Sequence, residues 1–253
     1  MTRPRIEIAA SILTADFGHL DRVVRKLERA AVDRLHLDVM DGHFVPNLTF
    51  GPDVVAAFRR LSTLPLDVHL MIAQPSRYVP RFVDAGADTV TFHVEVGEPD
   101  DVKRRTIEAI RGAGRDGGMA VNPDTPVEAV RPFVPILDIV MVMTVHPGFG
   151  GQRFIPEAAP KLRPAAEWFE QRPTLYDGAR GPGRVHVDGG VNHESADIVG
   201  AYGADVCIVG SALFQRGLDT ARAVELVRRR AEEGRRAGPS RVAGEQVAAL
   251  PRG

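Results

Sequence analysis

Two histidines and two aspartates lie in short apolar segments of the chain and could together hold a divalent cation. His36 and Asp38 lie in RLHLDVMDG, His69 lies in LDVHLM, and Asp188 lies in VHVDGGV. Alternate side chains of a β-strand point to the same face, so His36 and Asp38 would share one face. A buried carboxylate needs a partner, and a shared divalent cation would supply one while leaving both carboxylates able to move protons. We therefore expect these four residues to form a metal site.

The elements that must position these residues are eight runs rich in Val, Ile and Leu, alternating with amphipathic stretches at a spacing typical of βα units. Strands are expected at residues 6–13, 35–40, 66–72, 89–95, 118–122, 137–145, 184–187 and 206–209. Helices are expected at residues 20–31, 52–61, 77–85, 102–113, 126–133, 160–170, 196–202 and 220–230. Runs that are apolar on both faces indicate parallel strands, and polar candidates recur at the end of strand after strand. The sequence therefore predicts an α/β protein with a single (β/α)8 TIM barrel over residues 1–230, rather than an open doubly wound sheet.

Two segments are expected to be peripheral to this barrel. Residues 171–183 are rich in Gly and Pro and form a longer link than usual between a helix and the next strand, which suggests a surface loop. Residues 231–253 mix charge with Gly and Pro and lose the helical period, so we expect a flexible C-terminal tail.

The composition is typical of a soluble enzyme. The chain has 253 residues and a formal net charge of −1, which gives no electrostatic reason to expect nucleic acid or an anionic membrane as a partner. The single cysteine, Cys207, lies in the apolar run DVCIVG and is interpreted as a core thiol in a reducing compartment. The N-terminus lacks a long apolar segment, and no run approaches the ~18 apolar residues of a membrane span. We expect a cytoplasmic protein.

Longer motifs make the chain resemble the ribulose-phosphate 3-epimerase family from about residue 5 to about residue 230. In order, these motifs are ASILTADFGHL, LHLDVMDGHFVPNLTFGP, LDVHLMI, TFHVE, AVNPDTP, VMVMTVHPGFGGQRFI, VHVDGGVN and ADVCIVGSALF. The resemblance implies a (β/α)8 barrel that uses one divalent metal ion per subunit to interconvert D-ribulose 5-phosphate and D-xylulose 5-phosphate. It also suggests a homo-oligomer. His and Asp ligands suit Zn, Fe, Mn or Co, so the identity of the metal stays open.

The resemblance also assigns roles to single residues. It makes His36, Asp38, His69 and Asp188 the metal ligands, with Asp38 and Asp188 also the two catalytic acid/base groups. The substrate-binding residues that it implies are Ser11, His69, Gly148, Phe149, Gly150, Gly151, Asp188, Gly189, Gly190, Gly210 and Ser211. The methionines that it places as a cover over the active site are Met40, Met71 and Met143, although each could equally be a core residue.

The proposed chemistry demands this kind of constellation on physical grounds. Inverting a carbon next to a ketone requires removal of its proton on one face and return of a proton on the other, so two acid/base groups must flank the substrate. The intermediate is an enediolate, whose developing charge a cation stabilises. Glycine loops after the sixth, seventh and eighth strands leave backbone N–H groups uncovered, as a phosphate cradle requires.

Other polar residues have plainer interpretations. Asp41 and His43 follow a strand where Asp-Gly favours a turn, so a loop-shaping role and a substrate contact are both open. His93 is better explained as a hydrogen-bonded core histidine than as a catalytic group. His186 shares a face with Asp188 one step deeper, and Asp67 relates to His69 in the same way; packing is somewhat favoured over support of the site for His186.

Three functions compete on the sequence alone. The nearest rival to the pentulose-phosphate epimerase is the same chemistry on a hexulose phosphate such as D-allulose 6-phosphate, which sequence motifs separate poorly. A metal-dependent decarboxylase or aldol-type enzyme on a related barrel would favour an Asp-x-Lys-x-x-Asp motif, whereas this chain has DVMDG. A protein that only binds sugar phosphate is the third, and the intact pair of carboxylates argues against it.

Overall fold

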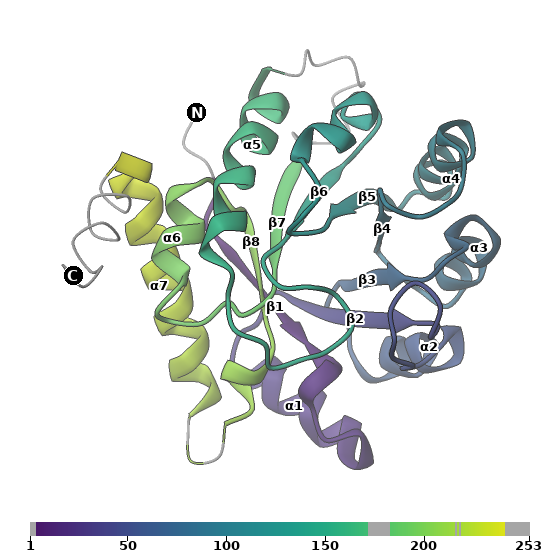
Figure 1. Ribbon diagram of the computed structural model, residues 1–253. Coiled ribbons are helices and arrows are strands. Elements are labelled where there is room, and N and C mark those ends of the chain that lie inside the picture. The colour runs from purple at the N-terminus through teal and green to yellow at the C-terminus, as the bar shows by residue number, and fades with distance from the viewer. Residues whose placement is uncertain (1–3, 172–182, 216, 218, 241–253) are drawn as a thin grey trace.

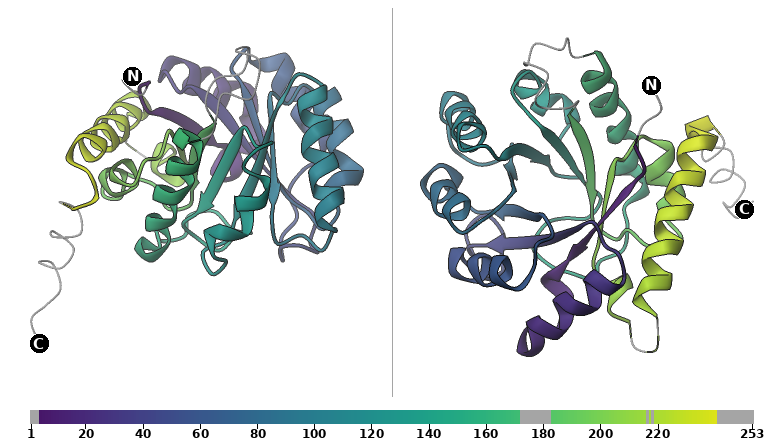
Figure 2. Two further views of the ribbon diagram at one scale, coloured as in Figure 1. Left: turned by 90° about the horizontal axis from the view of Figure 1, so that it is seen from above. Right: turned by 180° about the vertical axis from the view of Figure 1, so that it is seen from behind.

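A computed structural model of the chain describes residues 4–171, 183–215, 217 and 219–240. In these residues eight parallel strands close into one barrel in the order β1 to β8, with helices around the outside (Figures 1 and 2). The strands are β1 (Glu7–Ser11), β2 (Arg34–Met40), β3 (Leu66–Met71), β4 (Thr89–His93), β5 (Asp116–Val121), β6 (Ile139–Met143), β7 (Arg184–Asp188) and β8 (Val206–Val209). The α-helices are α1 (Leu20–Arg29), α2 (Pro52–Leu61), α3 (Pro75–Asp84), α4 (Asp100–Gly112), α5 (Leu162–Gln171), α6 (Ala196–Ala201) and α7 (Thr220–Ala237). The predicted single (β/α)8 TIM barrel is confirmed.

Short 3-10 helices lie in the connections between these elements. They are η1 (Ile12–Thr14), η2 (Phe17–His19), η3 (Val127–Phe133), η4 (Pro156–Lys161) and η5 (Ser211–Leu213). The sequence predicts an ordinary helix over 126–133, but the structure has the tighter η3 there. Pro132 lies inside η3 and has no N–H to donate to a preceding turn, which disfavours a continued α-helix.

The alternation of side chains along the strands divides the barrel into an apolar outer layer and a mixed interior. On β2, Leu35, Leu37 and Val39 belong to the main core between strands and helices, whereas His36 and Asp38 are buried on the other face. A second apolar cluster includes Ala9, Met141 and Ile208 and fills part of the barrel interior. The polar residues of the strands are therefore held in a rigid, buried frame.

The strand register brings the candidate site residues of neighbouring strands level with one another. In the β2–β3 pair, His36 is opposite Asp67 and Asp38 is opposite His69. In the β6–β7 pair, Met143 is opposite Asp188. A slip of one residue would turn each of these side chains to the other face, so the buried pattern fixes the register.

The last helix is longer than the sequence predicts. The pattern places its end at Arg230, but α7 continues to Ala237. Ala231 and Gly234 of the added turns are buried, and α7 lies against α6 (Figure 1), so tertiary packing holds a charged segment in helical form. Of the predicted tail at 231–253, residues 231–237 lie in α7 and residues 241–253 lie outside the described residues, as do residues 172–182 of the predicted loop at 171–183.

Gly200 allows this close packing of α6 on α7. A Cβ atom at Gly200 would lie 1.9 Å from the carbonyl oxygen of Ala231. Because this oxygen belongs to the backbone, it cannot move aside as the end of a side chain would. We expect Gly200→Ala to lower the free energy of unfolding by about 1–3 kcal/mol or more. The matched control is Gly112→Ala at the end of α4, where an added Cβ meets nothing within 4 Å and should change stability by less than about 1 kcal/mol. Urea denaturation of both variants measures this, and equal stabilities would contradict the packing argument.

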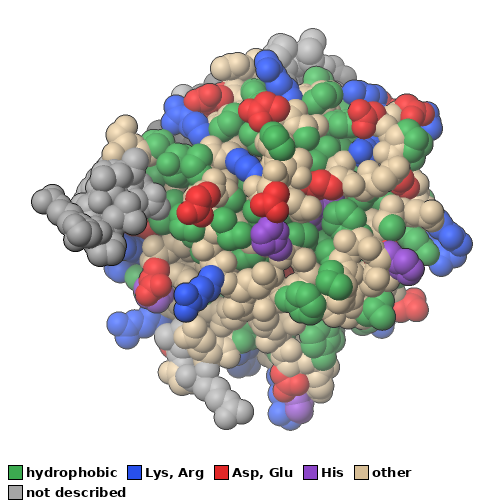
Figure 3. Space-filling view, in the orientation of Figure 1, with side chains coloured by type: hydrophobic (Ala, Val, Ile, Leu, Met, Phe, Trp, Pro, Cys, Tyr) green, Lys and Arg blue, Asp and Glu red, His purple; other side chains and the backbone are tan. Residues whose placement is uncertain are grey.

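The described surface offers two further observations. Lys and Arg side chains are interspersed with Asp and Glu over the face shown in Figure 3. Among the described residues, no helix is both long enough and apolar enough to cross a membrane.

Candidate metal centre and active site

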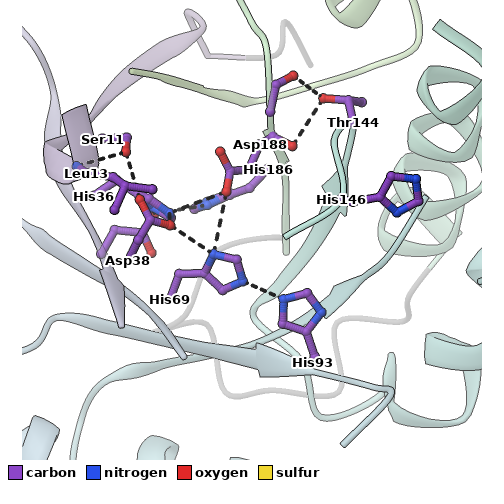
Figure 4. Close-up of polar contacts among 12 residues, drawn as sticks. Ser11, Leu13, His36, Asp38, His69, His93, Thr144, His146, His186 and Asp188 are labelled. Atoms are coloured by element: carbon purple, nitrogen blue, oxygen red, sulfur yellow. Dashed lines mark hydrogen bonds and ion pairs between the residues drawn. The ribbon is translucent and has the colours of Figure 1, made fainter. Parts of the chain in front are cut away.

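The four residues that the sequence singles out meet inside the barrel (Figure 4). One ligand atom from each of His36, Asp38, His69 and Asp188 lies within 4.8 Å of the other three. His36 Nε2 is 3.3 Å from Asp38 Oδ1 and 3.7 Å from Asp188 Oδ2. His69 Nδ1 is 3.3 Å and 3.5 Å from the same two oxygens. Two nitrogens and two carboxylate oxygens therefore converge on one point.

The donor set fits a divalent cation. His36 Nε2 is buried, faces the two carboxylates, and has no hydrogen-bond partner among the described residues. A buried polar atom without a partner is costly, and a metal ion between the four ligand atoms would satisfy it. Two neutral imidazoles and two carboxylates are also a common ligand chemistry for first-row divalent metals. The cluster is therefore capable of binding a metal.

Mutual charge shifts the pKa values within the cluster. Burial alone would raise the pKa of Asp38, but His36 and His69 outweigh it and hold that pKa well below its usual range. Burial would lower the pKa of His36, but Asp38 and Asp67 raise it overall, and the pKa of His69 is raised in the same way by Asp188 and Asp38. Asp38 therefore stays ionised, as a metal ligand must.

A buried carboxylate, that of Asp67, contacts the ring nitrogen of His36 that faces away from the cluster. His36 Nδ1 donates a hydrogen bond to Asp67 Oδ2 at 3.0 Å, and His186 Nδ1 lies 3.4 Å from the same oxygen. Both partners are fully buried. With its proton on Nδ1, His36 presents the lone pair of Nε2 to the cluster. Asp67 therefore supports His36 directly, whereas neither ring nitrogen of His186 has a hydrogen-bond partner among the described residues.

His69 has a different support. Its Nε2 lies 2.8 Å from Nε2 of His93, and His93 Nδ1 lies 3.2 Å from Glu95 Oε2. Burial, with a smaller contribution from His69, lowers the pKa of His93 to about 4, so His93 is a neutral, hydrogen-bonded core histidine as the sequence suggests. Glu95 is not among the residues predicted from the sequence, because its contact with the site depends on which ring nitrogen each histidine turns toward the cluster.

Both acid/base candidates border one pocket at the mouth of the barrel. Asp38 also accepts a hydrogen bond from the Ser11 hydroxyl at 2.7 Å through Oδ2, which leaves Oδ1 facing the histidines. The expected site residues that line this pocket are Ser11, Asp38, Met40, Met71, Met143, Gly148, Phe149, Gly150, Gly151, Asp188, Gly189, Gly190, Gly210 and Ser211. His36 and His69 are fully buried behind the carboxylates.

The pocket combines an apolar cover with glycine loops. Met40 and Met71 form a buried cluster with Val45, and Met143 belongs to the apolar interior of the barrel. The glycines after β7 are required by geometry: a Cβ at Gly190, whose φ is +65°, would lie 2.4 Å from the backbone nitrogen of Phe154. Only glycine lets these two loops approach so closely.

Residues outside the predicted set anchor the loops around the pocket. Thr144 donates its hydroxyl to the Gly189 carbonyl at 2.6 Å, and Asn47 donates its side-chain N–H to the Gly148 carbonyl at 2.7 Å. Both contacts join segments far apart in sequence, so no local pattern indicates them. In the sequence, these two residues could be noticed only as polar side chains, Thr144 at the end of a strand and Asn47 in a loop.

Three other polar residues, Asp41, His43 and His146, do not line this pocket. Asp41 accepts hydrogen bonds from the backbone N–H groups of His43, Phe44 and Ala73 and so shapes the loop after β2. His146 is exposed and points away from the cluster (Figure 4), with Nδ1 3.7 Å from Asp124. These positions favour the loop-shaping interpretation of Asp41 and His43.

Cys207 is buried in β8, and burial raises the pKa of its thiol to about 12. Because the thiolate is the reactive form, native protein at pH 8 should resist iodoacetamide, and the thiol should be alkylated once urea unfolds the chain. Mass spectrometry of the labelled protein measures both. Rapid labelling of the native protein with loss of activity would contradict the interpretation of Cys207 as an inert core thiol.

Comparisons with known proteins agree with this geometry. Solved structures of similar fold include 3-hexulose-6-phosphate synthase from Salmonella typhimurium (TM-score 0.65, 18% identity, 90% of this chain and 100% of that one). They also include 3-keto-L-gulonate-6-phosphate decarboxylase from Vibrio cholerae (TM-score 0.67, 12% identity, 91% of this chain and 99% of that one). At such low identity these two show a shared barrel only.

Sequence relatives are much closer. The chain is 45% identical over 212 residues to a ribulose-phosphate 3-epimerase of Rhodobacter capsulatus, covering 84% of this chain and 87% of that protein. It is 41% identical over 223 residues to the Bacillus subtilis ribulose-phosphate 3-epimerase, covering 88% of this chain and 98% of that protein. The sequence model of the Ribulose-phosphate 3 epimerase family matches residues 7–214. The chain therefore belongs to the ribulose-phosphate 3-epimerase family of isomerases.

Proposed function

We propose that this protein interconverts D-ribulose 5-phosphate and D-xylulose 5-phosphate with the help of one divalent metal ion per subunit. The observation that carries the proposal is the convergence of two carboxylates and two imidazoles at the floor of a glycine-lined pocket. Membership of the family supports the choice of reaction, and the relatives named above carry that activity in their names.

Asp38 and Asp188 are the proposed acid/base pair. They approach the pocket from β2 and β7, so a ketose between them would have a carboxylate on each side of its C3 carbon. One carboxylate removes the C3 proton from one face, and the other, in its protonated form, returns a proton to the opposite face. In the reverse reaction the two residues exchange roles.

The four residues of the cluster would hold Zn, Fe, Mn or Co. When bound, such a cation supplies positive charge that stabilises an enediolate. His36 and His69 hold it without adding negative charge, so the carboxylates contribute the only anionic ligands of the set. The Ser11 hydroxyl orients Asp38 by its hydrogen bond to Oδ2.

Other parts of the pocket suit the remainder of a ketose phosphate. Gly148, Gly151, Gly189 and Gly190 line the pocket with positive φ angles in the loops after β6 and β7, and backbone N–H groups of such glycine loops suit a phosphate. Met40, Met71 and Met143 offer the intermediate an apolar cover, which keeps water and its protons away from the enediolate.

The substrate assay separates the pentulose from its hexulose rival. We expect conversion of D-ribulose 5-phosphate to D-xylulose 5-phosphate at a kcat/KM well above that for epimerisation of D-allulose 6-phosphate, measured side by side with metal-replete protein. Preference for the hexulose would keep the mechanism and change the substrate. Turnover of neither would refute the proposal and favour a sugar-phosphate binding protein.

Two further expectations belong to the same proposal. A cytoplasmic location, expected from the single core cysteine, and a homo-oligomeric state, implied by the family resemblance, both stay predictions. Sedimentation equilibrium of the purified protein tests the second, because a monomer at micromolar concentration would contradict it.

A further inference from the structure

A chain of three side chains leads from the cluster through two histidines to the carboxylate of Glu95. His69 of β3 contacts His93 of β4 through the two Nε2 atoms at 2.8 Å, and His93 Nδ1 is 3.2 Å from Glu95 Oε2 (the two histidines are drawn in Figure 4). The two ring planes are inclined to each other by 22°, and their centroids are 4.9 Å apart. Both histidines are fully buried.

The contact between the two histidines admits one hydrogen atom only. Two ring nitrogens at 2.8 Å repel one another if both carry a proton or if neither does, so one must donate and the other accept. If His69 donates, its Nε2 carries the proton and its Nδ1 keeps a lone pair facing Asp38 and Asp188. If His93 donates, neutral His69 carries its proton on Nδ1, where it blocks a cation.

The carboxylate at the far end decides between these two states. An ionised carboxylate only accepts, so His93 Nδ1 must donate to Glu95, and neutral His93 must then accept at Nε2. The other oxygen of Glu95 accepts the backbone N–H of Asn122 at 2.7 Å, which fixes the orientation of the carboxylate. The direction of every hydrogen bond in the chain therefore follows from Glu95.

We propose that Glu95, acting through His93, is a positioning residue that sets the tautomer of His69 and so keeps its Nδ1 free for the metal ion. The inference rests on the proposed metal centre. It differs from the support of His36, where the Asp67 carboxylate contacts the ligand histidine directly. In the His69 arm a neutral imidazole separates the ligand from the negative charge, so the ligand nitrogen is kept free of a proton with less added anionic charge beside the substrate.

The substitution Glu95→Gln tests this with almost no change of shape. The backbone N–H of Asn122 still needs an oxygen opposite it, so the glutamine amide must turn its NH2 group toward His93. That group donates to Nδ1, which moves the proton of His93 to Nε2 and the proton of His69 to Nδ1. We expect the metal dissociation constant, measured by competition with a chromogenic chelator, to rise about 10- to 100-fold.

Glu98→Gln is the matched control. It makes the same change three residues further along the same loop, where the carboxylate accepts hydrogen bonds from the hydroxyl and the backbone N–H of Ser76. It should leave the metal dissociation constant unchanged. In Glu95→Gln, saturating metal should restore most of kcat, because the catalytic carboxylates are untouched, and a merely structural role would not give this recovery.

A second measurement needs no variant. Nitrogen-15 NMR of the wild-type histidines should show His93 protonated on Nδ1 and bare on Nε2, with His69 protonated on Nε2. The opposite tautomers, or an unchanged metal affinity in folded Glu95→Gln, would overturn this inference alone. Failure of the wild-type protein to bind any of the four candidate metals would instead overturn the metal centre, and the inference with it.

Discussion

Asp188→Asn is expected to lower kcat for epimerisation by about 10²- to 10⁴-fold, because the variant lacks one of the two groups that move the C3 proton. Asparagine keeps the shape of the side chain, and Asp188 lies at the mouth of the barrel rather than in its apolar core, so the fold should persist. Steady-state kinetics with D-ribulose 5-phosphate measures the loss, and circular dichroism checks the fold. An active Asp188→Asn enzyme would overturn the mechanism with two carboxylates.

Because Asp188 is also a proposed metal ligand, the fall in kcat could come from loss of an acid/base group or from loss of the metal ion, and the two causes must be separated. Metal content measured on the variant shows whether the cation is retained. With metal retained, Asp38 should still exchange the C3 proton of one epimer, but not the other, with deuterium from solvent. The matched control is Asp53→Asn, an exposed aspartate in the first turn of α2, which should leave kcat unchanged.

Removal of the metal should abolish turnover almost completely. A cation that stabilises the charge of an enediolate contributes several kcal/mol to the transition state, roughly 10³-fold in rate. We expect dialysis against a chelator to remove activity, and stoichiometric Zn, Fe, Mn or Co to restore it to different extents. The activity regained per equivalent of each metal is the measurement.

The control for this experiment is the stability of the protein without metal. Burial of apolar side chains between strands and helices does not depend on the cation, so the metal-free protein should keep its secondary structure. Full activity after exhaustive chelation, with no metal detected in the protein, would contradict the proposed role of the cluster.

The sequence predicts the barrel because strands buried on both faces leave an unambiguous pattern. On β2, apolar Leu35 and Leu37 alternate with His36 and Asp38, and the structure turns the first pair to the helices and the second to the interior. Where packing between distant segments decides, the prediction fails. The extension of α7 to Ala237 depends on burial of Gly234 against α6, and no local period indicates it.

For the site, too, local sequence patterns predict some features, and contacts between distant segments decide the others. Residue types at strand ends indicate His36, Asp38, His69 and Asp188, since a parallel barrel brings such ends together. The roles of their supporting partners depend on ring orientation. His36 turns Nε2 inward and His69 turns Nδ1 inward, so one is held by a carboxylate and the other by an imidazole. A sequence states which residue is present but not which nitrogen faces the cluster.

The most direct test of the central claim is epimerisation of D-ribulose 5-phosphate in D2O, with the product examined by NMR early in the reaction. Removal of the proton by one carboxylate and its replacement by the other predicts that each molecule of D-xylulose 5-phosphate carries deuterium from solvent at C3. Product that retains the original hydrogen at C3 would contradict the account.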